Sequence, residues 1–179
     1  MSTTTVFTAP GTRAQIIEFF ALEKELPLSL RPCGDRTSAA YLKIHPFGKL
    51  PAALTSDGTA IFESGAILLY LSDLSSPAAN PSKRASLSKW VLWANASLWP
   101  AVESARKIPT PMLTGLEAIL STQPFLNGTD FTVADAAVGS YLHYASVFFG
   151  EKFPGAPSVT KYLAALRARP HFISTIGNE

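Results

Sequence analysis

The chain has 179 residues, of which 47% are hydrophobic and 16% charged, and its formal net charge is +2. This composition supports a substantial core in one large domain or two small ones, and it is unlike that of a disordered chain. The sequence has neither the basic stripe of a nucleic-acid groove nor the roughly 20 apolar residues of a membrane span. Its start lacks a secretory signal pattern, so we expect a cytoplasmic protein that binds neither nucleic acid nor membrane.

The first part of the chain alternates strand and helix patterns. A β-branched and aromatic run at residues 6–8 predicts a strand, and the apolar spacing that follows predicts a helix that Thr12 can cap. Residues 28–30 predict a second strand. Asp35 is a candidate cap for a short helix that ends at Leu42.

An Asp-Gly pair at Asp57 and Gly58 separates the apolar runs 51–55 and 60–62, which is a strong hairpin signal. A helix over residues 63–74 follows. The resulting order, β-α-β-α-β-β-α, combines parallel strands with an antiparallel hairpin. This is the element order of a thioredoxin-like α/β domain, which we assign to residues 1–75.

After a linker at residues 76–81, the pattern is helical to the end, and residues 82–179 are predicted to form an all-α helical bundle domain. Apolar residues recur at helical spacing over 87–102, with a break or kink at Pro100. Thr132 and Asp135 predict a capping box before a buried core helix. Further helices are expected at 112–120, 158–169 and 172–176.

Cysteine and histidine usage excludes two kinds of chemistry. Cys33 is the only cysteine, so the chain has no intramolecular disulfide and no Cys-x-x-Cys redox pair. The three histidines share no ligand spacing, and we predict no metal site. Cys33 is interpreted as a small buried apolar residue.

The stretch from His45 to Ser64 carries the chemistry. Leu50 precedes a proline that opens a strand, so its backbone N–H and C=O can stay free at the sheet edge for an extended peptide. Glu63 and Ser64 begin a helix, whose N-terminus can hold a carboxylate while Glu63 accepts from an ammonium group. Lys49 adds a cation for a second carboxylate. Glutathione is a peptide with these groups, although Glu63 and Ser64 alone also fit an ordinary helix start.

The sequence His45-Pro-Phe-Gly-Lys-Leu-Pro51, followed by Phe62-Glu-Ser-Gly-Ala-Ile67, resembles the glutathione-binding domain of the glutathione transferases. In that family Asn-Pro-x-Gly-x-x-Pro precedes Glu-Ser-x-Ala-Ile. Residues 125–135 resemble the capping-box segment of the second domain of the family. The segments 93–98, 135–142 and 169–177 are most similar to the compact chi class, so the resemblance extends along nearly the whole chain.

The resemblance implies roles for individual residues. Pro51 should follow a cis peptide bond, and Leu50 should pair with the cysteinyl part of glutathione. Glu63 and Ser64 should bind the γ-glutamyl head, and Lys49 should reach a carboxylate. His45 departs from the family because it stands where Asn is usual. The segment 31–40, which normally helps to hold the glycine end, is shortened, and Arg36 is a candidate replacement.

The same resemblance places the group that activates the glutathione thiol in the loop at residues 8–14. Thr12 falls where the chi class carries serine, and Arg13 can add positive charge near the sulfur. The alternatives are a helix cap for Thr12 and a surface or dimer-interface charge for Arg13. The loop contains no cysteine, so thiol-transferase chemistry is not expected.

The sequence therefore predicts an enzyme, a detoxifying glutathione transferase that uses glutathione as co-substrate. Its expected electrophiles are small and apolar, such as isothiocyanates or aryl halides. The family also implies a homodimer and an electrophile pocket between the domains, with candidate lining residues Trp93, Trp99, Arg106, Tyr141 and Tyr144. The alternatives are a non-catalytic binding or interaction module on the same fold and a glutathione-dependent peroxidase.

Overall fold

A computed structural model describes residues 3–77 and 80–178. The chain divides into two compact units, an N-terminal unit of Met1–Pro77 with Asn178–Glu179 and a C-terminal unit of Ala78–Gly177. The predicted linker includes residues 78 and 79, which lie outside the described residues. Within the described ranges, none of the helices has the length and apolar character that a membrane crossing needs.

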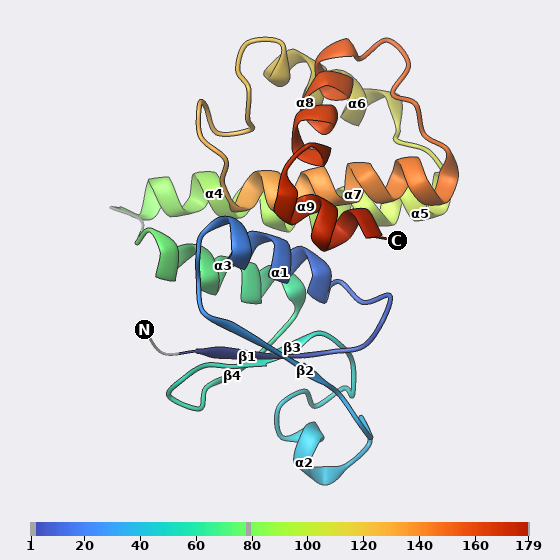
Figure 1. Cartoon of the computed structure of the whole chain (residues 1–179). Coiled ribbons are helices and arrows are strands. Elements are labelled where there is room, and N and C mark those ends of the chain that lie inside the picture. The colour runs from blue at the N-terminus through green and yellow to red at the C-terminus, as the bar shows by residue number, and fades with distance from the viewer. Residues whose placement is uncertain (1–2, 78–79, 179) are drawn as a thin grey trace. The chain divides into compact units, whose positions relative to one another are not determined.

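The N-terminal unit is a four-stranded sheet with helices on both faces, and it confirms the predicted element order. Its strands lie in the order β2-β1-β3-β4, with β1 parallel to β2 and antiparallel to β3, and β3 antiparallel to β4. In Figure 1, α1 and α3 lie side by side on one face and α2 on the other. The elements are β1 (Thr4–Thr8), α1 (Ala14–Glu23), β2 (Leu28–Pro32), α2 (Ala39–Leu42), β3 (Ala52–Leu54), β4 (Ala60–Phe62) and α3 (Ser64–Ser75).

The two predicted helix caps in this unit are wrong. Helix α1 has Arg13 at its N-cap position and no side-chain cap, because the Thr12 hydroxyl donates to the Ala9 carbonyl at 2.8 Å. Helix α2 is capped by Ser38. Asp35 lies too early in the chain to cap α2, and its carboxylate accepts the Thr37 N–H at 2.8 Å within the preceding turn.

Cys33 was predicted to be a small buried apolar residue, and the structure corrects this, because the side chain is only half-buried. Its N–H donates to the Thr8 carbonyl at 2.8 Å and extends the pairing of β1 with β2. Its side chain packs against a small cluster of Phe7, Tyr41 and Ala52 and lines a cavity of about 310 Å³. The short α2 leaves this face of the sheet partly open.

The C-terminal unit is helical, as predicted. At the expected break near Pro100, the chain forms one π-helical segment, and the side-chain amide of Asn95 in it donates to the Val91 carbonyl at 2.9 Å. The elements are α4 (Pro81–Trp93), the π-helix η1 (Ala94–Leu98), α5 (Trp99–Ala105), α6 (Thr110–Leu120), α7 (Val133–Phe149), α8 (Pro157–Arg167), α9 (Pro170–Ser174) and the 3-10 helix η2 (Ile176–Asn178), whose last residue belongs to the N-terminal unit.

Helix α7 forms the centre of this unit and is buried from Val133 to Ala145. Trp99 stacks on Tyr141 with ring centroids 5.2 Å apart and packs edge-on against Tyr144. All three rings are at least nine-tenths buried. These candidate pocket residues are therefore core residues of the C-terminal unit, as aromatic residues at helical spacing commonly are.

Asp135 confirms the predicted capping box and does more than close it. Its Oδ2 accepts the Thr132 N–H at 2.9 Å and the Thr132 hydroxyl at 3.0 Å. Its Oδ1 accepts the Leu126 N–H at 2.9 Å and the Tyr162 hydroxyl at 3.1 Å. One fully buried carboxylate thus connects the start of α7 to the loop before it and to α8.

His143 gives the C-terminal unit an acid-sensitive element. It is buried on α7, where Arg167 Nε donates to its Nδ1 at 2.9 Å and the Phe172 ring packs edge-on at 5.1 Å. Burial and the Arg167 cation lower the pKa of His143 from 6.5 to about 4. The folded protein therefore keeps this ring uncharged at a pH where the unfolded chain protonates it. Its contribution to stability is complete above pH 6.5 and is lost as the pH falls to 4.

We accordingly expect the thermal unfolding midpoint to fall less steeply between pH 6.5 and pH 4 for His143→Gln than for the parent protein. Thermal unfolding scans at several pH values measure this difference. The pH dependence that comes from the carboxyl groups of both proteins cancels in the comparison. Parallel pH profiles for the two proteins would contradict the expectation.

Candidate functional site

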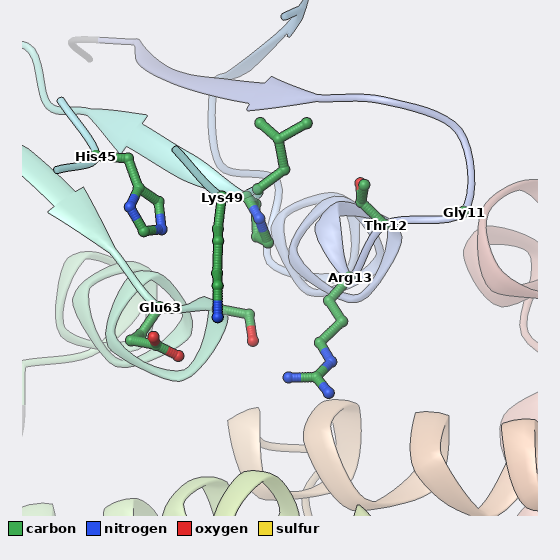
Figure 2. Close-up of a pocket in the computed structure, with 9 residues that line it drawn as sticks. Gly11, Thr12, Arg13, His45, Lys49 and Glu63 are labelled. Atoms are coloured by element: carbon green, nitrogen blue, oxygen red, sulfur yellow. The ribbon is translucent and has the colours of Figure 1, made fainter. Parts of the chain in front are cut away.

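The predicted site residues lie together around one cavity of about 300 Å³ in the N-terminal unit. Figure 2 shows that its lining comes from the loop between β1 and α1, the segment before β3 and the start of α3. The lining includes the residues predicted to activate the thiol and to bind the peptide, adds Gly11 and His45, and does not include the candidate Arg36. The full set is Gly11, Thr12, Arg13, His45, Lys49, Leu50, Pro51, Glu63 and Ser64.

The loop between β1 and α1 contributes a cation and a hydroxyl that already donates a hydrogen bond within the loop. Gly11 has a φ of +69°, a conformation that favours glycine, and it turns the chain towards α1. The Thr12 hydroxyl donates to the Ala9 carbonyl, and its oxygen lies 3.1 Å from the Thr8 hydroxyl oxygen. Arg13 lies at the N-cap position of α1 and extends away from Thr12 in Figure 2.

The segment before β3 presents a free backbone. The Tyr41 hydroxyl donates to the Lys49 carbonyl at 2.6 Å and fixes this turn. The Leu50–Pro51 bond is cis, which confirms the expectation from the resemblance. The Leu50 N–H and C=O make no hydrogen bond among the described residues.

The expectation that Leu50 lies at a sheet edge is wrong. The edge strands are β2 and β4, and β3 lies between β1 and β4. The pairing of β1 with β3 ends where Phe7 faces Ala52, and Leu50 lies before that point in the chain. Its backbone is free because the neighbouring strand has ended, and an extended ligand can reach it only at the end of the sheet.

Glu63 is held in an unusual backbone conformation at the start of α3. Its φ is +71°, and its side chain makes no capping hydrogen bond although it occupies the N-cap position. A non-glycine residue in such a region costs about 1–3 kcal/mol and is common at functional sites. Ser64, the next residue, is 4% exposed and begins the helix. An ordinary cap does not explain Glu63, because its carboxylate caps nothing.

His45 is the lining residue whose part the sequence missed. It is 2% exposed, and its Nδ1 accepts the Phe47 N–H at 3.3 Å. Its ring packs on Phe62 with centroids 4.9 Å apart. An asparagine oxygen can accept the same kind of local N–H, so either residue can support this turn at the position where the motif usually has Asn. The departure from the motif was the one signal in the sequence.

The charges around the cavity are mixed. Arg13 and Lys49 bring two cationic groups and Glu63 brings one carboxylate. In Figure 2 the Lys49 side chain extends between His45 and Glu63 on one side and Thr12 and Arg13 on the other. A ligand with two carboxylates and one ammonium group complements this arrangement. No group of three or more His, Cys, Asp or Glu residues able to hold a metal ion occurs within residues 3–77 and 80–178.

Both units match models of known protein families. Residues 13–74 match the glutathione S-transferase N-terminal domain, and residues 100–165 match the glutathione S-transferase C-terminal domain. Together the two matches cover more than half of the chain.

Among curated proteins, the chain is similar to elongation factor 1-gamma of Homo sapiens, with 27% identity over 157 residues. It is also similar to elongation factor 1-gamma of Danio rerio, with 29% identity over 160 residues. These matches cover 76% and 78% of this chain but 36% of each relative. The chain thus spans about a third of the length of these relatives.

Solved structures share the fold. A theta class glutathione S-transferase from Xanthomonas axonopodis pv. citri, with glutathione bound, has a TM-score of 0.80 and 22% identity, with 98% of each chain covered. A glutathione transferase family member from Pseudomonas fluorescens, with two glutathione bound, has a TM-score of 0.81 and 22% identity, and 97% of this chain and 92% of that chain are covered.

Proposed function

We propose that this chain, which belongs to the glutathione transferase family, binds glutathione in the cavity of its N-terminal unit and conjugates its thiolate to small apolar electrophiles. The observation that carries the proposal is the cavity itself. It collects Arg13, Lys49, Glu63 and Ser64 with the free backbone of Leu50, and these groups match the charges and the backbone of the tripeptide.

Each part of glutathione has a partner in this proposal. The Glu63 carboxylate accepts from the γ-glutamyl ammonium group, and Ser64 with the N-terminus of the 12-residue helix α3 holds the neighbouring carboxylate. The Leu50 backbone pairs with the cysteinyl residue as a short added strand. The Lys49 ammonium attracts the second carboxylate.

The reaction requires a thiolate. A free thiol has a pKa near 8.5, so only a few per cent is ionised at neutral pH. The Thr12 hydroxyl has one proton and donates it to the Ala9 carbonyl, so it has to leave that bond before it can donate to sulfur. We therefore assign the larger part of thiolate stabilisation to the positive charge of Arg13 and a smaller part to Thr12.

The thiolate then acts as the nucleophile. With an isothiocyanate, the sulfur bonds to the central carbon and the nitrogen takes a proton from solvent. With an activated aryl halide, the sulfur bonds to the ring carbon and halide leaves. The resemblance to the chi class favours the isothiocyanate.

The test is glutathione consumption above the uncatalysed rate with an aryl isothiocyanate, an aryl halide and an organic hydroperoxide. Arg13→Gln is expected to lower kcat/KM by roughly 10- to 50-fold, because it removes a charge of the size that shifts a neighbouring pKa by one unit or more. Thr12→Val, which keeps the shape and removes the hydroxyl, is expected to cost less than about fivefold.

The pH profile of kcat/KM separates a thiolate effect from a loss of binding. Arg13→Gln is expected to move the thiol-dependent limb to higher pH, because the thiol then ionises less readily. A larger loss in Thr12→Val than in Arg13→Gln would move the activating role to Thr12. Rapid turnover of the hydroperoxide alone would favour a glutathione-dependent peroxidase.

The elongation factor 1-gamma relatives favour a second candidate, an interaction module that retains the fold without transfer chemistry. Calorimetry with glutathione separates the two candidates. Glutathione binding without consumption of any electrophile in the panel would support the module.

We also propose a homodimer, from family membership. Light scattering at micromolar concentration tests this, and a monomeric mass would contradict it.

A further inference from the structure

One nitrogen of the His45 imidazole is bonded within the protein, and the other is left for the cavity. Because Nδ1 accepts the Phe47 N–H, the proton of the ring lies on Nε2. Among the described residues Nε2 has no hydrogen-bond partner. It is also not one of the completely buried polar atoms that lack a partner, so it is accessible. Only 2% of His45 is exposed, and the residue lines the cavity. The one accessible polar atom of this side chain is therefore a donor available to a ligand.

The ring that carries this donor is held firmly. Phe62 packs on one face at 4.9 Å, and Phe47 packs edge-on at 6.1 Å. The His45 carbonyl accepts the Gly48 N–H at 2.9 Å and fixes the turn below the ring. A preorganised donor loses little conformational freedom when it meets a ligand, and a ligand that buries this donor without accepting its hydrogen bond binds more weakly. The site is thus built for a hydrogen-bond acceptor at this point.

The choice of acceptor rests on the proposed function. Glutathione has two carboxylates, and Ser64 with the α3 N-terminus accounts for the γ-glutamyl one. His45 and Lys49 lie on the same short segment, at either end of the turn at residues 46–48. We propose that His45 Nε2–H donates to the glycyl carboxylate of glutathione beside the Lys49 ammonium. Residue 45 then determines how strongly the tripeptide is preferred over γ-glutamylcysteine, which lacks glycine.

The test is calorimetric titration of the full chain with glutathione and with γ-glutamylcysteine. In His45→Asn, the amide oxygen can still accept the Phe47 N–H, but no donor reaches the position of Nε2. This variant is expected to bind glutathione about tenfold more weakly and γ-glutamylcysteine within about twofold of the parent, because the terminal carboxylate of γ-glutamylcysteine lies one residue short of the glycyl position. In His45→Gln, the longer amide places an N–H near the position of Nε2, and we expect glutathione affinity within about threefold of the parent.

The pair of ligands keeps the two proposals separate. A parent protein that binds neither peptide would overturn the proposed function. A parent that binds both peptides equally, or a His45→Asn variant that loses both equally, would overturn the glycyl contact while leaving the glutathione site in place. Unfolding midpoints of both variants are measured alongside. If His45→Asn does not fold, the glycyl contact is still tested by whether the parent and His45→Gln bind glutathione more tightly than γ-glutamylcysteine.

Discussion

Glutathione affinity is expected to fall roughly 10- to 100-fold in Glu63→Gln, the range of one hydrogen bond between charged groups. The substitution keeps the size of the side chain and removes the charge that meets the ammonium group. Glu63 is exposed and caps nothing, so the fold loses no internal contact with it. Calorimetry measures the affinity, and thermal unfolding checks that the midpoint is retained.

Glu63→Gly provides the matched control on the backbone. Glycine adopts the φ of +71° without the penalty that glutamate incurs, so we expect this variant to be more stable by about 1 kcal/mol. It should nevertheless bind glutathione as poorly as Glu63→Gln. Affinity that is retained in both variants would show that this carboxylate has no part in binding, and lower stability of the glycine variant would show that the conformation is unstrained.

The stability of the C-terminal unit is expected to fall by about 3–5 kcal/mol in Asp135→Ala, the cost of breaking a buried charged network by removing one member. The carboxylate is fully buried, and four donors depend on it, from Leu126, from the N–H and hydroxyl of Thr132, and from Tyr162. Without the carboxylate these donors lose their shared acceptor, and the loop before α7 is no longer connected to the start of that helix. Urea unfolding followed by circular dichroism measures the loss.

Tyr162→Phe is the control for this network. It removes one donor to Asp135 and keeps the ring, so we expect a loss of about 1 kcal/mol. A similar loss in Tyr162→Phe and Asp135→Ala would show that Asp135 acts through Tyr162 alone. A negligible loss in Asp135→Ala would contradict the role of the carboxylate as the link between loop and helix.

Local signals in the sequence were enough for the element order, and together with the family resemblance they were enough for most of the cavity lining. The Asp57-Gly58 pair lies between the two strands of the β3–β4 hairpin, because this dipeptide adopts the required turn without strain. The Thr132 and Asp135 pair predicted the start of α7, because a capping box is formed between residues three apart. The domain boundaries and the roles of the site residues stay predictions.

Features that depend on strand order and on distant contacts could not be predicted. Leu50 was placed at a sheet edge, but β3 is a central strand, and only its pairing with both β1 and β4 decides that. The Thr12 hydroxyl donates to the Ala9 carbonyl and does not cap the helix. The sequence could not predict this, because it does not determine the conformation of the loop. In the sequence His45 is a departure from a motif, and in the structure its Nδ1 accepts the Phe47 N–H and the residue lines the cavity.

The sequence by itself therefore determined which elements form and which segments carry the polar groups of the site, because turns, caps and periodicity are properties of neighbouring residues. Only the tertiary structure decided which of those groups are already bonded within the protein and which face the cavity. Each hydroxyl or ring nitrogen can make only a few hydrogen bonds, and the packing of residues distant in the chain selects among them. Thr12, already bonded to Ala9, and His45, held against Phe62, are the two residues where that selection matters for the proposed function.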